Sequence, residues 1–190
     1  VSGKWVYQSE VIDYVEEDLF MSPDLSTIRK IPWNKEPTAQ IICDLNYPSN
    51  EPSKLAPRQV LKNIIKQLSD EDVQAVVAPE LEFYLCEQNL DPDLPLKTPI
   101  GKSGRRETGS RVFGIDAVNE FDELTDDIYD YCELMNIGVD TLVHESGPSQ
   151  IEINLNHGDP LALADQAFMF KRAVRQVALK HNIHATFMAK

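Results

Sequence analysis

The chain has 190 residues, of which 42% are hydrophobic and 26% are charged, and its formal net charge is -13. This length is enough for one full core, or for one domain and part of another, and the composition is that of an ordinary globular protein. The 31 acidic residues outnumber the 18 basic ones and the sequence has no basic stripe, so nucleic acid is not an expected partner.

Cysteine usage and hydropathy indicate the compartment. The three cysteines, Cys43, Cys86 and Cys132, are far apart and form no CxxC pair, which disfavours a zinc knuckle or a disulfide framework. No apolar run reaches the length of a membrane span or a signal-peptide core. We therefore expect a cytoplasmic protein with no membrane partner. The sequence starts at Val1 without a methionine and stops at Lys190 directly after an apolar run, which favours a fragment.

The first part of the chain is predicted to form strands. Two runs rich in β-branched residues, 26–31 and 38–45, are separated by prolines. A stretch rich in proline, serine and asparagine, 47–57, follows and is typical of a connector. We predict a boundary there, with 1–50 and 51–190 as two units.

Three later segments have the apolar periodicity of amphipathic helices. The first begins at Pro57, the second covers 123–136 with Gly138 placed to end it, and the third begins at Asp159-Pro160. The predicted apolar faces are Val60, Leu61, Ile64, Ile65 and Leu68 in the first helix, Leu124, Ile128, Tyr131, Cys132 and Met135 in the second, and Leu163, Ala167, Phe170, Val174 and Val177 in the third.

The segments between these helices complete an alternating order. Residues 76–85 and 145–156 have strand-like alternation, and 184–190 resume β character. Residues 88–120 lack periodicity and are predicted to form an extended loop. The order strand, helix, strand, helix, strand, helix, strand predicts an α+β or α/β layering with helices on one face of a sheet.

Four glutamates in the two strand-like segments are the most informative feature of the chain. Glu80 and Glu82 share one side of the first segment, and Glu145 and Glu152 belong to the second. A sheet that presents several carboxylates on one face must neutralise them, and divalent cations with oxygen ligands do so. The pattern predicts that these strands form the floor of a magnesium or manganese site.

The same pattern also has a structural interpretation. A strand with glutamate on its outer face is commonly a half-buried strand whose polar side is in water. Gln150, Asn154 and Asn156 around Glu152 favour a site, because amides are unfavourable in strands without a specific role. His144 is either a ligand or, as is more common at the end of an apolar strand, a packed and hydrogen-bonded residue.

Other catalytic motifs are disfavoured. Residues 101–103, GKS, are similar to the end of a phosphate-binding loop, but Leu96 stands where that loop requires glycine. The surrounding loop, with Arg105 and Arg106, is interpreted as a basic surface loop rather than an anion site. The sequence shows no Ser-His-Asp or Cys-His arrangement.

Four motifs of the chain resemble the glutamine synthetase superfamily, in the same order and over nearly the whole length. The matching segments are SPDLST (22–27) for MPDxST, APELEFYL (78–85) for PExEF(F/Y)L, HE (144–145) with QIEI (150–153) for HE…GQxE(I/F), and ATFMAK (185–190) for ATFM(A/P)KP. Residues 115–122 and 157–161 resemble the γ-glutamylputrescine synthetase-like branch.

The resemblance implies an α+β fold and a reaction. Residues 1–50 would be the end of a β-grasp domain, and 51–190 the first half of a catalytic domain with a curved antiparallel sheet and helices on its outer face. Members of the family join glutamate to ammonia or an amine: ATP phosphorylates the γ-carboxylate, and the nitrogen attacks the acyl phosphate. The implied partners are therefore glutamate, ATP and the amine, together with further copies of the chain in a ring-forming homo-oligomer.

The resemblance also implies roles for individual residues. Glu82, Glu145 and Glu152 match ligands of the Mg²⁺ or Mn²⁺ ion beside the amino-acid substrate, and Glu80 matches a ligand of a second ion that bridges the ATP phosphates. Glu145 would also act near the incoming nitrogen. Asp140 falls where the family has a glutamate near the nucleotide.

The sequence departs from the family in two respects. A metal-binding histidine, the glutamate-binding loop and several arginines follow Lys190 in family members, so these 190 residues alone are expected to be inactive. No DxSS loop is visible and Val112 falls at the tyrosine position of the ammonium pocket, which favours an amine larger than ammonia. Two other interpretations stay open: a non-catalytic binding or regulatory relative, and a metal-dependent phosphate-ester hydrolase, which the lack of a basic channel disfavours.

Overall fold

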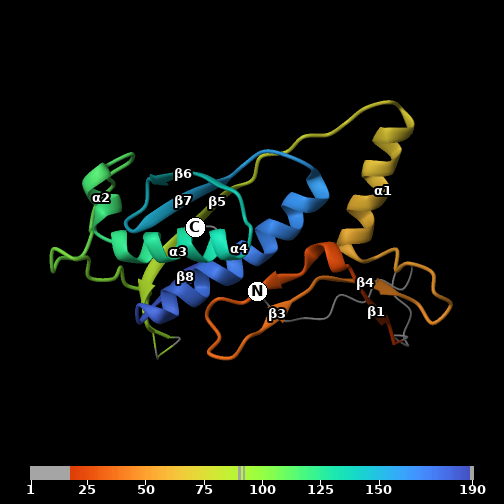
Figure 1. Cartoon of the computed structure of the whole chain (residues 1–190). Helices are drawn as coiled ribbons and strands as arrows, with labels where there is room; N and C mark the ends of the chain where they lie inside the picture. The colour runs from red at the N-terminus through yellow and green to blue at the C-terminus, as the bar shows by residue number, and fades with distance from the viewer. Residues whose placement is uncertain (1–17, 90, 92, 189–190) are drawn as a thin grey trace.

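A four-stranded antiparallel sheet is the centre of the fold in the computed structural model, which describes residues 18–89, 91 and 93–188. Its strand order is β6-β7-β5-β8, and the four strands cover Val139–His144, Gln150–Leu155, Glu80–Glu87 and Ile183–Thr186, respectively. Helices α3 (Asp122–Leu134) and α4 (Pro160–Lys180) lie along one face of this sheet (Figure 1). The predicted layering, with helices on one face of a sheet, is confirmed.

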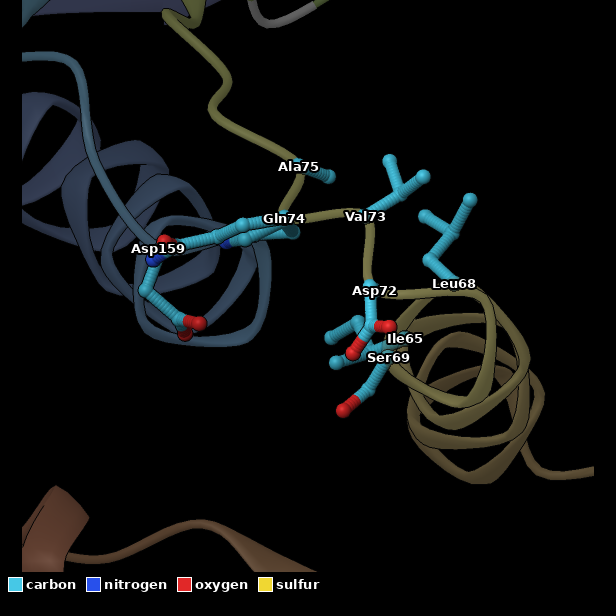
Figure 2. A pocket seen from close by; sticks show the side chains of 9 residues that line it. Ile65, Leu68, Ser69, Asp72, Val73, Gln74, Ala75 and Asp159 are labelled. Carbon is cyan, nitrogen blue, oxygen red and sulfur yellow. The ribbon is translucent and has the colours of Figure 1, made fainter.

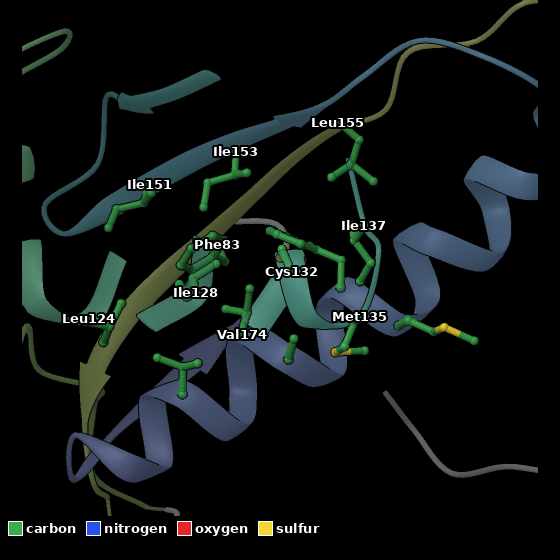
Figure 3. Close-up of a cluster of buried hydrophobic side chains, with 14 of the residues drawn as sticks. Phe83, Leu124, Ile128, Cys132, Met135, Ile137, Ile151, Ile153, Leu155 and Val174 are labelled. Atoms are coloured by element: carbon green, nitrogen blue, oxygen red, sulfur yellow. The ribbon is translucent and has the colours of Figure 1, made fainter. Parts of the chain in front are cut away.

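The core fills the space between this sheet and the two helices (Figure 3). Alternate residues of β5 and β7 point into it, and the most buried, at 2% exposure or less, are Phe83, Leu85, Ile151, Ile153 and Leu155. Burying each such side chain stabilises the fold by about 1.5–3 kcal/mol. From the helices come Leu124, Ile128, Cys132, Leu163, Phe170, Val174 and Val177, as their periodicity predicted. Because side chains alternate along a strand, the remaining residues of β5 and β7 point away from the helices.

Two small antiparallel sheets form the N-terminal region. β1 (Phe20–Pro23) pairs with β4 (Cys43–Asn46), and β2 (Arg29–Lys30) pairs with β3 (Ala39–Gln40). The predicted strand 26–31 is wrong in its first half, because residues 25–27 form a 3-10 turn. The predicted strand 38–45 is interrupted at 41–42. The assignment of this region to a β-grasp domain stays a prediction, and residues 1–17 lie outside the described part.

Helix α1 (Pro57–Asp70) begins at the predicted proline but does not join the core. Val60 and Ile64 on its apolar face are each 47% exposed, and the helix contains no buried residue. In Figure 1 it stands apart from the four-stranded sheet, between the N-terminal sheets and the loop that leads into β5. None of the helices in the described part of the chain combines the length and apolar composition needed to cross a membrane.

Arg58 of α1 joins three elements through ion pairs. Its Nη2 lies 2.6 Å from Asp24 Oδ2 and 3.0 Å from Asp165 Oδ2 of α4. Its Nη1 lies 2.7 Å from Asp44 Oδ1 of β4. Hydrogen bonds from Ser26 and Arg58 lower the pKa of Asp24 to about 2. Because this pKa is depressed, the stabilisation is present above the usual carboxyl range and is lost as the pH falls towards that value.

The segment 145–156, predicted as one strand, is the turn and second strand of a hairpin formed by β6 and β7. Gly147 lies in the turn, where a Cβ atom would be 2.5 Å from Tyr84 Cε1, so only glycine fits. Ser149, the last residue before β7, has a φ of +56°. Glu145 therefore lies directly after β6, the strand next to β7, and not in β7 itself.

Two further local predictions are corrected. The short helix α2 (Ile115–Asn119) lies within 88–120, which was predicted as loop. The chain leaves α3 through Asn136, whose φ is +53°, rather than through Gly138. Asparagine adopts this left-handed conformation more readily than most residues. Gly138 instead allows close packing, because a Cβ there would lie 2.7 Å from Asn156 Nδ2.

Replacing Arg58 by alanine is expected to destabilise the protein by about 3 kcal/mol, because three carboxylates would lose their common cation in a partly buried setting. Lys66→Ala is the control, since its ion pair with Asp70 on the same helix is exposed and contributes at most about 0.5 kcal/mol. Urea unfolding measures both effects. Equal loss of stability in the two variants would contradict the role assigned to Arg58.

Candidate functional site

Two glutamates on neighbouring strands face each other across the sheet. In the register of β5 and β7, Glu82 is paired with Glu152, and Glu80 is paired with Asn154. Residues directly opposite in antiparallel strands have Cβ atoms about 4.5–5.5 Å apart. These side chains lie on the face turned away from α3 and α4, because the alternate residue Phe83 points into the core. The alternation in the sequence predicted this shared face.

Glu145 joins the same face from the end of β6. Its N–H donates to the carbonyl of Gln150 at 2.9 Å, which extends the β6–β7 ladder by one residue beyond His144. Val143, two residues before Glu145, is paired with Glu152. Strand alternation therefore places Glu145 on the same side as Glu152.

The amide of Gln150 is oriented by three hydrogen bonds. Its Oε1 accepts from the hydroxyl of Tyr84 at 2.9 Å and from the N–H of Gly147 at 2.8 Å. Its Nε2 consequently faces Glu82 and donates to Oε2 at 2.6 Å. In the sequence analysis Gln150 was significant only as a neighbour of Glu152, and Tyr84 had no role. Since Tyr84 continues the alternation of Glu82, the same signal identifies it.

The electrostatic interaction among the four carboxylates is seen in the pKa of Glu152. Burial raises the pKa of Glu152, against the opposing effect of a hydrogen bond from Asn154. The negative charges of Glu145, Glu80 and Glu82 raise it further. Because the folded-state pKa lies above its ordinary value, the charge on Glu152 costs stability once the pH rises through that pKa. A bound cation would remove this repulsion.

His144 is packed beneath the site and does not point to the carboxylates. Its side chain is 1% exposed, and its Nε2 lies 2.9 Å from Glu107 Oε2. His144 is paired with Ile151, whose side chain is in the core, so its ring lies on the helix-covered side. The interpretation of His144 as a packed, hydrogen-bonded residue is confirmed. No sequence signal pointed to Glu107, which lies in a segment without periodicity.

Comparison with known proteins identifies the family. The family described as "Glutamine synthetase, catalytic domain" matches residues 54–190. The chain belongs to the glutamine synthetase family. Gamma-glutamylputrescine synthetase PuuA of Escherichia coli (strain K12) is 36% identical over 177 residues, which cover 92% of this chain and 38% of that protein. Glutamate–isopropylamine ligase of Pseudomonas sp is 30% identical over 177 residues, covering 91% of this chain and 37% of that protein.

Solved structures agree with this family assignment. The structure titled "Apo GmaS without ligand" has a TM-score of 0.79 and 25% identity, and the match covers 94% of this chain and 40% of that one. A structure titled "Crystal structure of novel glutamine synthase homolog" has the same fold, with a TM-score of 0.73 at 19% identity, over 90% of this chain and 38% of the other. The chain thus spans about two fifths of the length of these relatives.

The donor set of this glutamine synthetase-family site suits a hard divalent cation, since carboxylate oxygens are the ligands that Mg²⁺ and Mn²⁺ prefer. Within the ranges that the structure describes, no group of three or more acidic, histidine or cysteine side chains is already arranged to hold an ion. Glu80 and Glu82 are exposed, and Glu82 is bonded to Gln150. Closing a ligand shell therefore requires rotation of side chains rather than movement of the strands.

Asp140 lies apart from the four glutamates. It is exposed within β6, in the part where the pairing with β7 is irregular. Its charge helps to raise the pKa of Tyr129 in α3, after the larger effects of burial and of Cys132. The role of Asp140 near a nucleotide stays a prediction.

The loop that carries GKS is held by acidic partners. Lys102 forms an ion pair with Asp122, and Arg106 forms one with Glu87. With these two cations already engaged, the loop suits the interpretation as a basic surface loop better than that of an anion site.

A separate groove of about 390 Å³ lies between the C-terminal end of α1 and the start of α4 (Figure 2). Its lining includes Ile65, Leu68, Asp72, Gln74 and Asp159. None of the four glutamates lines it. The carboxylate face and this groove are therefore distinct features of the fold.

Glu152→Gln is expected to weaken Mn²⁺ binding at least about tenfold, because it removes a charged ligand from the set. The variant should unfold at the same or a higher urea concentration than the wild type, since it relieves the repulsion that raises the pKa of Glu152. Glu87→Gln is the matched control, because Glu87 lies on the same strand as Glu82 but is paired with Arg106. If Glu152→Gln unfolds the protein and leaves metal affinity unaltered, the purely structural interpretation of β7 is correct.

Proposed function

We propose that the intact protein is an ATP-dependent ligase that joins glutamate to an amine or to ammonia through a γ-glutamyl phosphate intermediate. The observation that carries this proposal is the carboxylate face. There Glu82 is paired with Glu152, and the charges of Glu80 and Glu145 help to raise the pKa of Glu152. Membership of the glutamine synthetase family connects this face to a reaction. Among the described residues no basic side chain forms an ion pair with these four acids, and divalent cations would supply the missing positive charge.

The four glutamates divide between two ions in this proposal. Glu82, Glu145 and Glu152 hold one Mg²⁺ or Mn²⁺ beside the amino-acid substrate, and Glu80 contributes to a second ion at the ATP phosphates. Glu80 and Glu82 are about 7 Å apart along β5, and their division between two neighbouring ions rests on the family resemblance. When bound, the ions neutralise charge on the transferring phosphoryl group as Lewis acids. The assignment of Asp140 to the nucleotide rests on the family resemblance alone.

Glu145 has a second role in this proposal. A carboxylate beside the incoming nitrogen favours binding of the ammonium form, and it can accept the proton that the nitrogen loses on attack. Its place at the end of β6, rather than inside the sheet, leaves it accessible to a second substrate.

The amine side of the site is apolar. Val112 and Phe113 are 41% and 71% exposed, and the N–H of Phe113 donates to the carbonyl of His144 at 2.9 Å, one residue before Glu145. Apolar side chains here favour an amine with a carbon chain, because ammonium requires polar partners. Gamma-glutamylputrescine synthetase and glutamate–isopropylamine ligase, two relatives of the chain, carry such amines in their names.

Phosphate release by the intact protein tests this function. Release is expected only when ATP, Mg²⁺ or Mn²⁺, glutamate and an amine are all present. Putrescine or isopropylamine should exceed ammonia in kcat/KM by at least about tenfold, since apolar contacts discriminate to that degree. Glu145→Ala should lower kcat about 100-fold or more, and Glu87→Gln should leave it unchanged. Release without glutamate contradicts the proposal, and binding of ATP and glutamate without turnover supports a non-catalytic relative.

A further inference from the structure

Glu145 is held differently from the other three glutamates. Glu80, Glu82 and Glu152 belong to the ladder between β5 and β7, and Glu152 is also paired with Val143 of β6. Glu145 is the first residue of the hairpin turn, and its N–H bond to Gln150 is the last rung of the ladder. The direction of its carboxylate therefore depends on what fixes the turn.

Glu107 reaches this turn from a loop 37 residues upstream. Its Oε2 accepts a hydrogen bond from the N–H of Ser149 at 2.6 Å, and the same atom lies 2.9 Å from His144 Nε2. The other ring nitrogen, Nδ1, donates to the carbonyl of Glu145 at 2.8 Å, because a carbonyl can only accept. One carboxylate oxygen thus connects both ends of the turn and, through the imidazole, the backbone of Glu145.

The pair formed by Glu107 and His144 is deeply buried, and its burial costs folding free energy. The side chains of His144 and Glu107 are 1% and 9% exposed. In the described part of the chain, Glu107 Oε1 and Ser149 Oγ are buried without a hydrogen-bond partner. A surface loop could be anchored more cheaply by apolar contacts, since unsatisfied buried polar atoms destabilise a fold. The arrangement is better explained by a demand for a defined turn geometry.

We propose that Glu107 and His144 are positioning residues that hold the carboxylate of Glu145 in the direction required of a metal ligand. The inference rests on the proposed metal role of Glu145. Outer groups of this kind orient the side chains that bind a metal, and a small change in their geometry weakens binding. Glu107 and His144 act through the backbone of the turn and contact neither metal nor substrate.

Glu107→Ala in the intact protein tests this inference, with Mn²⁺ alone as the probe and electron paramagnetic resonance as the readout. The affinity for Mn²⁺ is expected to fall about 10–100-fold. Thr98→Val is the matched control, because Thr98 Oγ1 donates to the carbonyl of Glu107 at 3.0 Å and anchors the same loop without touching the turn. Its Mn²⁺ affinity should equal that of the wild type, even where its thermal unfolding midpoint is lower.

If the alanine variant does not fold, Glu107→Gln is the second variant, because it preserves the shape of the side chain. A neutral amide oxygen is a weaker acceptor than a carboxylate for the N–H of Ser149 and no longer holds the turn as firmly, so the Mn²⁺ affinity should also fall. A folded Glu107→Gln variant with wild-type affinity overturns the positioning role and leaves the proposed function intact. Absence of Mn²⁺ binding by the wild type overturns the proposed function and this inference together.

Discussion

The antiparallel register of β5 and β7 is the constraint on which the site depends. One register sets Phe83 opposite Ile151 in the core and Glu82 opposite Glu152 on the other face. A slip of one residue would exchange the two faces and turn the glutamates towards α3 and α4. Like charges directly opposite each other cost on the order of 0.2–1 kcal/mol, whereas each large apolar side chain in the core contributes about 1.5–3 kcal/mol. The core therefore decides the register, and the carboxylates are held together despite their repulsion.

The residues around the glutamates do not neutralise their negative charges. The amide of Gln150 donates to Glu82, and no basic residue is bonded to Glu80, Glu82, Glu145 or Glu152 in the described part of the chain. Arg58, by contrast, is paired with three aspartates elsewhere, namely Asp24 before the 3-10 turn, Asp44 of β4 and Asp165 of α4. A stable core on one side and uncompensated negative charge on the other make the sheet a rigid support for added cations.

The alternation of β5 is enough to predict its two faces, because a period of two admits only one division of Leu81, Glu82 and Phe83. The place of Glu145 could not be predicted in this way. The turn around Gly147 and Ser149 interrupts the alternation, and the sequence alone does not show where β6 ends and β7 begins.

Contacts between segments that are far apart in the chain could not be predicted from the sequence either. Glu107 and His144 are 37 residues apart in the sequence, and Arg58 and Asp165 are 107 residues apart. No periodic pattern in the sequence connects the two members of either pair. The apolar periodicity of α1 predicted a helix correctly, but it could not show that Val60 and Ile64 remain exposed. Periodicity reports the shape of one element, whereas burial depends on which element packs against it.

Anomalous diffraction from crystals of the intact protein soaked in Mn²⁺ tests the central claim most directly. A site built on the β5–β7 register predicts a strong peak bounded by the carboxylates of Glu82, Glu145 and Glu152, and a second peak on the side of Glu80 when ATP is present. A well-ordered sheet with no peak at these carboxylates, or with a peak elsewhere in the molecule, would contradict it.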